Sequence, residues 1–217
     1  MADTRRLLAA FGYVAPVVSI SFVVLATLID PKFAWQTRSL SSLGEATGTS
    51  VLALSSGNQL AFDLFNAGLF LTGLLGLPFV VALWGDTESR IERAGIGMLV
   101  VTMLGLMGVG VSFLDGPFDQ FHFPSASVFF FGVALTLWIF SSGSIKRTGG
   151  ERGLGFVWLA NVYVLQWVIW MILEATAFSG DDVWTWFAVP EFAAALVLSA
   201  WIVTQARRLR SPAATHP

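Results

Sequence analysis

Residues 94–114 read AGIGMLVVTMLGLMGVGVSFL, a run of 21 residues without a charge, whose only hydroxyl side chains are Thr102 and Ser112. A helix needs about 20 mostly apolar residues to cross the roughly 30 Å of bilayer hydrocarbon, so the run predicts a membrane-spanning helix. The run also contains five glycines: Gly95, Gly97, Gly105, Gly108 and Gly110. Small residues let helix backbones approach closely in lipid, so we expect this helix to lie centrally among tightly packed neighbours. A flexible or ligand-contacting helix is the alternative explanation.

Five further apolar runs of spanning length surround this one. They lie at residues 7–29, 61–84, 123–140, 154–178 and 184–206. The chain as a whole is 55% hydrophobic and 12% charged, whereas soluble domains carry roughly 25% charged residues. The sequence therefore predicts an all-α polytopic membrane protein, a single six-helix bundle with little mass outside the bilayer. The longest connection is 30–60, and residues 50–54 within it suit a short interfacial or re-entrant helix.

The basic residues are segregated on one side of the predicted spans. Ten of the 12 Lys and Arg residues fall before the first span, in the second and fourth connections, or after the last span. Only Lys32 and Arg38 fall on the other side. Because Lys and Arg are retained on the cytoplasmic side, we expect both termini in the cytoplasm and residues 30–60 outside.

Composition excludes several kinds of chemistry. The chain has no Cys, which excludes disulfides, thiolate metal sites and cysteine nucleophiles. Both lysines lie in connections, so no span offers a Schiff-base partner for retinal, and too few histidines are present for a bis-histidine haem. The net charge is -2 and no basic run with interleaved aromatics is present, so no nucleic-acid partner is expected. We predict no cofactor and no metal site.

Polar side chains gather at the predicted outer ends of the spans. Asp63 and Asn66 begin the second span, His122 leads into the fourth, Glu174 ends the fifth, and Glu191 is expected about two turns into the sixth. Polar and ionisable groups inside a bilayer are costly, so these five are candidate ligand-binding residues. We expect Glu191 to share a cavity with Asp63, Asn66 or Glu174. The structural alternatives are a helix cap for Asp63 and interfacial positions for His122 and Glu174.

The fifth span carries an aromatic and polar stripe. Tyr163, Trp167, Trp170 and Glu174 follow one another at spacings of four, three and four, which places them on one face of a helix. Two explanations remain open. The stripe packs in the core with its polar tips hydrogen-bonded, or it lines a cavity for a lipid tail or another apolar ligand.

Three short segments carry a resemblance to a known family. They are Ser39-Leu40-Ser41-Ser42-Leu43-Gly44, Leu64-Phe65-Asn66-Ala67-Gly68-Leu69, and Gly110-Val111-Ser112-Phe113-Leu114-Asp115, the last followed by His122. In this order the chain resembles the archaeal and bacterial six-span membrane family catalogued as domain of unknown function 998, over roughly residues 10–205. The resemblance implies six helices and a prokaryotic plasma membrane, and it implies no activity.

These observations support three functional hypotheses. The first is a protein that binds a membrane lipid, another apolar molecule or a partner subunit through a polar pocket in its outer half. The second is a membrane-embedded enzyme acting on an outer-leaflet lipid, with Asp63, His122, Glu174 and Glu191 as acid, base or metal ligands. That hypothesis requires His122 and at least two carboxylates to converge on one cavity. The third is a transporter.

Overall fold

The computed structural model describes residues 2–46, 57–148, 150–178 and 184–211, and within these ranges the chain is helical without any strand. In this part of the chain six α-helices are long and apolar enough to cross a membrane, which confirms the predicted fold class. Their bounds are α1 Ala2–Ile29, α2 Gly57–Gly85, α3 Arg90–Val111, α4 His122–Thr148, α5 Glu151–Thr176 and α6 Ala188–Arg210. Two short 3-10 helices, η1 (Leu40–Gly44) and η2 (Asp119–Phe121), lie in the connections.

The sixth helix begins later than predicted. Trp184 and Trp186 have positive φ angles of 71° and 60°, a left-handed conformation that interrupts a right-handed helix. The helix therefore starts at Ala188, and Glu191 lies in its first turn instead of about two turns into the span, which corrects the sequence-based expectation. The proposed short helix at residues 50–54 lies outside the described residues.

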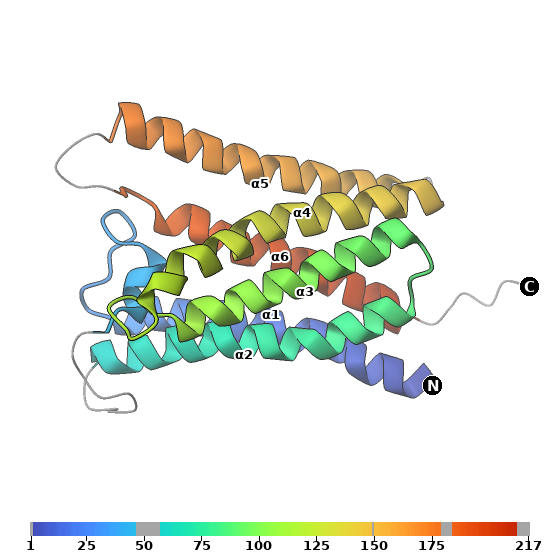
Figure 1. Cartoon of the computed structure of the whole chain (residues 1–217), viewed down its shortest axis with the longest axis horizontal. Coiled ribbons are helices and arrows are strands. Elements are labelled where there is room, and N and C mark those ends of the chain that lie inside the picture. The colour runs from blue at the N-terminus through green and yellow to red at the C-terminus, as the bar shows by residue number, and fades with distance from the viewer. Residues whose placement is uncertain (1, 47–56, 149, 179–183, 212–217) are drawn as a thin grey trace, which may run out of the picture.

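The helices form a bundle with α5 on its flank. Helix α5 packs against α4 and α6 and diverges from α4 toward the end of the bundle that holds η1 (Figure 1). We call this end of the bundle the η1 end. The opposite end, which holds the basic residues of α1 and α4, is called the terminal end. The beginning of α1 and the end of α6 both lie at the terminal end, as an even number of crossings requires (Figure 1).

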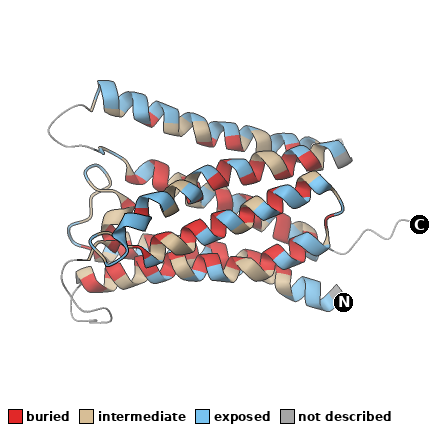
Figure 2. Ribbon diagram, viewed as in Figure 1, coloured by how far each residue is buried: buried red, intermediate tan, exposed pale blue. Residues whose placement is uncertain are grey.

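Helix α3 is closely packed but not central, so the predicted central position is wrong. It packs mainly against α2 and α4. Val101, Leu104 and Val111 are exposed along one side of it and face the surroundings of the bundle. Exposed residues are most frequent on α5, as the pale blue ribbon in Figure 2 shows.

The glycines of α3 explain its close packing. A Cβ atom built on Gly95 would lie 2.6 Å from the backbone nitrogen of Phe140, and one on Gly105 would lie 2.9 Å from that of Phe129. Both contacts are with α4, and the hydroxyls of Thr102 and Thr136 meet across the same interface at 3.2 Å. Small residues and interhelical hydrogen bonds therefore hold α3 against α4, as expected for helices in lipid.

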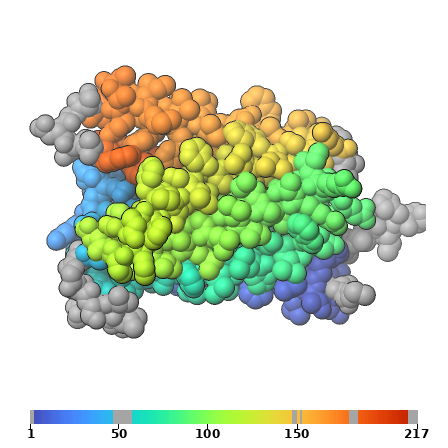
Figure 3. Space-filling model, viewed as in Figure 1, coloured from blue at the N-terminus to red at the C-terminus, as the bar shows by residue number. Residues whose placement is uncertain are grey.

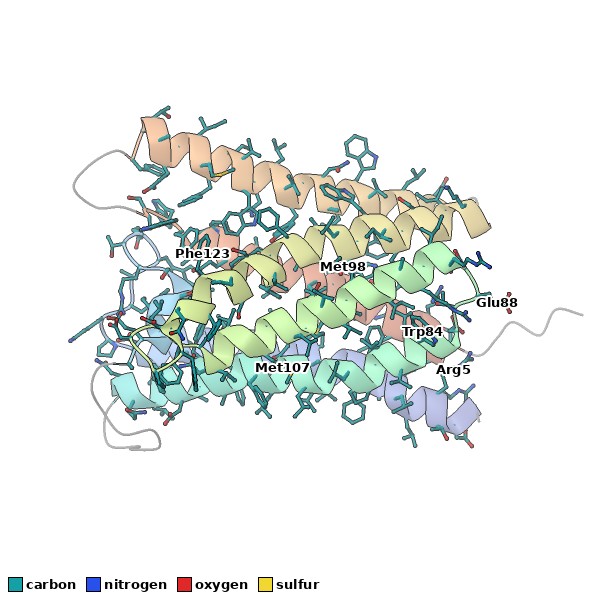
Figure 4. All side chains as sticks on the ribbon, viewed as in Figure 1. Arg5, Trp84, Glu88, Met98, Met107 and Phe123 are labelled. Carbon is teal, nitrogen blue, oxygen red and sulfur yellow. The ribbon has the colours of Figure 1, made fainter. Side chains whose placement is uncertain are left out.

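An ion-pair network ties three helices together at the terminal end. Asp86, just after α2, is 2.8 Å from the guanidinium of Arg5 and 3.1 Å from that of Arg208. The carboxylate thereby connects the start of α1, the end of α2 and the end of α6. Figure 4 labels Arg5 at this end and Phe123 at the opposite one.

Candidate functional site

The η1 segment, Leu40–Gly44 with its cap Ser39, forms a platform that packs against α1, α2 and α6. Ser39 caps its first turn: the Ser39 hydroxyl accepts a hydrogen bond from the Ser42 N–H at 3.2 Å, and the Ser42 hydroxyl donates to the Ser39 carbonyl at 2.7 Å. Leu40 and Leu43 are buried on the bundle side. The alternation of small polar and apolar residues in this segment thus separates a buried face from a face that carries hydroxyls.

Glu191 fastens the platform to α6. Its carboxylate accepts hydrogen bonds from the backbone N–H of Leu40 and from the Ser41 hydroxyl, the latter at 3.1 Å. The side chain is only 6% exposed. It lies in the first turn of α6, where the partial positive charge of a helix N-terminus stabilises an anion. These donors and this position explain how a carboxylate is tolerated in the bundle.

Asn66 holds the platform from the other side. Its side-chain amide donates to the Gly44 carbonyl at 3.4 Å and to the Phe62 carbonyl at 3.1 Å. A Cβ atom on Gly110 would lie 2.5 Å from the backbone oxygen of Asn66, so α3 and α2 touch at this level. The three segments that carry the family resemblance therefore meet at the η1 end.

A cavity of about 860 Å³ lies beside the platform, between α4 and α5. This volume is in the usual range for small-molecule sites. Figure 3 shows the surface hollowed between the orange atoms of α5 and the yellow-green atoms of α4. Lining residues on α4 run from His122 to Ala134. At 1.5 Å per residue this is about 18 Å, more than half of the roughly 30 Å hydrocarbon thickness.

The walls of the cavity are apolar, and its polar groups are concentrated at one end. Side chains from Phe130, Val164 and Trp167 contribute to the walls, whereas the platform contributes Ser41 and Ser42. Glu191 and His122 line the same polar end. A ligand that fits this distribution has a long apolar part and a small polar part at one end.

The mouth of the cavity faces sideways between two spanning helices. Phe123 and Phe131 on α4 are 75% and 73% exposed, and Met171 on α5 is 52% exposed; all three line the cavity. Large apolar side chains exposed on membrane-spanning helices contact lipid. The mouth of the cavity therefore opens on an apolar flank of the bundle, between two helices that are long and apolar enough to cross a membrane.

The comparisons with known proteins agree with the resemblance seen in the sequence. The family described as "Protein of unknown function (DUF998)" matches residues 13–208, which is most of the chain. The chain belongs to the DUF998 family. No curated protein and no solved structure shows a significant match to it.

His122 is held in one orientation in this DUF998 protein. Its Nδ1 lies 2.8 Å from the carbonyl oxygen of Ser112, at the end of α3. A carbonyl only accepts, so Nδ1 carries a proton and Nε2 is the unprotonated nitrogen of the neutral ring. The side chain is 7% exposed and lines the cavity. His122 can therefore accept a hydrogen bond from a molecule in the cavity.

Three residues of the stripe on α5 line the cavity: Tyr163, Trp167 and Trp170. The Tyr163 hydroxyl donates to the Phe130 carbonyl at 3.0 Å, and the Trp170 indole donates to the Thr185 carbonyl at 2.8 Å. The two explanations of the stripe are thus both represented, since the polar tips of Tyr163 and Trp170 are bonded within the protein and the rings form the cavity wall. Within the described ranges, the buried Trp167 indole nitrogen has no hydrogen-bond partner.

Three of the eight candidates do not line this cavity: Asp63, Asn66 and Glu174. Asp63 accepts from the Gln59 amide at 3.2 Å within its own helix, and Glu174 accepts from the backbone N–H of Trp184. The expectation that Glu191 shares its cavity with one of these three is therefore wrong. Helix α5 diverges at this end and carries Glu174 to the chain that precedes α6, while Asn66 points at the platform.

Sequence reasoning missed the cation at the polar end. Arg38 lines the cavity, and its guanidinium is bonded to Asp30 at 3.1 Å and to the Ser42 carbonyl at 3.0 Å. Glu45 lies 3.9 Å away from it. Arg38 immediately precedes the serine-rich segment, but nothing in its spacing indicated that it folds back onto the platform. Among the described residues no group of three or more His, Cys, Asp and Glu is arranged to hold a metal ion.

Proposed function

We propose that this DUF998 protein binds a membrane lipid in the cavity between α4 and α5. The observation that carries the proposal is the shape and chemistry of that cavity, a space of about 860 Å³ with apolar walls, a sideways mouth and polar groups at the η1 end. A lipid chain would occupy the walls formed by α4 and α5, and its polar part would meet the platform. The apolar walls would provide most of the affinity. In the cavity the hydrocarbon chain of the ligand makes fixed packing contacts with protein side chains, and in the bilayer it makes only contacts with mobile lipid chains.

The location belongs to the same proposal. We infer a prokaryotic plasma membrane, with both termini in the cytoplasm and the η1 end outside. The segregation of ten of the 12 basic residues supports this orientation. In it, the polar end of the cavity lies at the outer surface, and the bound lipid belongs to the outer leaflet.

The enzymatic hypothesis has less support. It needs His122 and at least two carboxylates around one cavity, whereas Glu191 is the only one of the proposed acidic residues that lines the cavity together with His122. Its carboxylate is engaged with Leu40 and Ser41. Transport and a partner subunit have no specific observation in their favour.

Lipid retention tests the proposal. The full chain is purified in a mild detergent, and the lipid that remains bound is extracted and quantified by mass spectrometry. Ser127→Trp places a large ring into the cavity from α4. Leu135→Trp places the same ring on the same helix, at a position that is already exposed and does not line the cavity. Lipid lost from Ser127→Trp and retained by Leu135→Trp supports the proposal. Equal lipid content in wild type and Ser127→Trp contradicts it.

A further inference from the structure

The polar end of the cavity offers both hydrogen-bond acceptors and hydrogen-bond donors: Ser41, Ser42 and His122 line it with acceptor atoms, and the guanidinium of Arg38 lines it with N–H groups. The Ser41 hydroxyl proton is directed to Glu191, and the Ser42 hydroxyl proton to the Ser39 carbonyl. What both hydroxyls retain is their lone pairs. The neutral His122 ring likewise retains Nε2 as an acceptor, because Nδ1 donates to the Ser112 carbonyl. A ligand that complements this end donates hydrogen bonds to these acceptors and accepts them from Arg38, and a hydroxyl group does both.

The charges at this end disfavour an ionic ligand of either sign. Glu191 lines the cavity as a buried acidic side chain whose oxygens accept hydrogen bonds from Leu40 and Ser41, so it does not attract a phosphate or carboxylate group. Arg38 lines it as a cation, which repels an ammonium group. The guanidinium is itself bonded to Asp30 at 3.1 Å and lies 3.9 Å from Glu45. An anionic head group would have to compete with these two carboxylates for Arg38.

We infer that the lipid bound between α4 and α5 carries an uncharged head group with several hydroxyls, such as a glycerol or sugar, whose O–H groups donate to Ser41, Ser42 and His122. The inference rests on the proposed lipid binding and adds the chemical class of the ligand. Hydroxyl groups both donate and accept hydrogen bonds and bring no net charge into the cavity. The platform would thus bind the polar head group, and the apolar walls would bind the hydrocarbon chain of the same molecule.

Three probes that share one brominated hydrocarbon chain and differ in their head groups test the inference: dibromostearoyl glycerol, dibromostearate and dibromostearylamine. Brominated chains quench tryptophan fluorescence on contact, and Trp167, Trp170 and Trp184 line the cavity. Each probe is titrated into the detergent-purified full chain, and unbrominated monooleoyl glycerol is used as competitor. We expect the glycerol probe to quench saturably and the competitor to reverse the quenching. Its half-saturating concentration should be about tenfold lower than that of either charged probe, as two or more net hydrogen bonds would give.

Serine variants locate the head group. Ser41→Ala and Ser42→Ala each remove a lone-pair acceptor and should weaken the glycerol probe about fivefold, the effect of one hydrogen bond, with no change for dibromostearate. Ser142→Ala, on the exposed side of α4 near the terminal end, is the matched control and should change nothing. Two variants are used so that a folding defect in one leaves the other as a test.

The outcomes separate the two proposals. If no probe quenches saturably, lipid binding in this cavity fails and the head-group inference fails with it. If a charged probe binds as tightly as the glycerol probe, or if both serine variants bind the glycerol probe like wild type, the head-group inference is wrong while lipid binding stands.

Discussion

Glu191, in the first turn of α6, accepts a hydrogen bond from the backbone N–H of Leu40, which lies 151 residues earlier in the chain. Leu40 is the first residue of η1, so its N–H has no carbonyl partner within that helix. One carboxylate thereby satisfies the start of η1 while it occupies the favourable start of α6. This contact fixes the platform that forms the polar end of the cavity.

Replacing Glu191 tests this contact. Glu191→Leu leaves the buried Leu40 N–H and the Ser41 hydroxyl without their acceptor, which should cost about 1–3 kcal/mol of stability. Glu191→Gln keeps an amide oxygen as acceptor and should cost less. Thermal unfolding of the purified protein in detergent measures both. Glu88→Leu, at an exposed position of the terminal end, is the control. A melting temperature of Glu191→Leu equal to that of wild type would show that the contact is unimportant for stability.

Two glycines of α3 provide a matched pair for the packing argument. Gly110→Ala would put its Cβ atom 2.5 Å from the Asn66 carbonyl oxygen and 3.0 Å from the Phe70 nitrogen, so α2 and α3 must separate. Overpacking of this kind costs about 1–3 kcal/mol. Gly97→Ala meets nothing within 4 Å and should be neutral or stabilising by roughly 0.5–1 kcal/mol, since alanine favours the helix. The two melting temperatures should move in opposite directions or differ clearly; the same shift in both would refute the close approach.

Trp170 connects α5 to the chain that precedes α6. Its indole donates to the Thr185 carbonyl at 2.8 Å, and its ring stacks on Trp184 with centroids 5.9 Å apart. Trp170→Phe keeps a ring and removes the donor, so we expect a loss of about 1 kcal/mol in stability. Trp158→Phe, at a position 68% exposed on the same helix, should have no such effect. Comparable thermal shifts for the two variants would mean that the Thr185 contact does not secure α5.

The sequence predicted the fold well because the bilayer imposes a strong constraint. Only α-helices and closed β-barrels satisfy their backbone hydrogen bonds inside hydrocarbon. Six apolar runs of about 20 residues or more are long enough for helices, so they lead directly to six helices. The ends of the helices were less predictable. The apolar run at 184–206 begins with Trp184 and includes Trp186, and composition does not reveal that these two residues adopt positive φ angles.

The candidate site was predicted in part. Burial cost drew attention to Glu191 and His122, and helical spacing identified the face of α5 that lines the cavity. The contribution of Ser41 and Arg38 depends on how residues 30–46 fold back over the bundle, which no periodicity encodes. The position of a polar side chain along its own helix also does not predict whether it lies near the polar side chains of other helices. Asp63 was expected near Glu191, but its carboxylate accepts a hydrogen bond from Gln59 within α2 and does not line the cavity.

The orientation of the bundle is the remaining prediction, and the absence of cysteine makes it simple to test. Lys32→Cys places one thiol at the η1 end, and Glu88→Cys places one at the terminal end; both positions are exposed. Because ten of the 12 basic residues lie toward the terminal end, we expect an impermeant maleimide added to whole cells to label Lys32→Cys only. Both variants should be labelled after permeabilisation, which controls for reactivity. Labelling of Glu88→Cys alone in intact cells would invert the topology. The polar end of the cavity would then face the cytoplasm, and the bound lipid would be one of the inner leaflet.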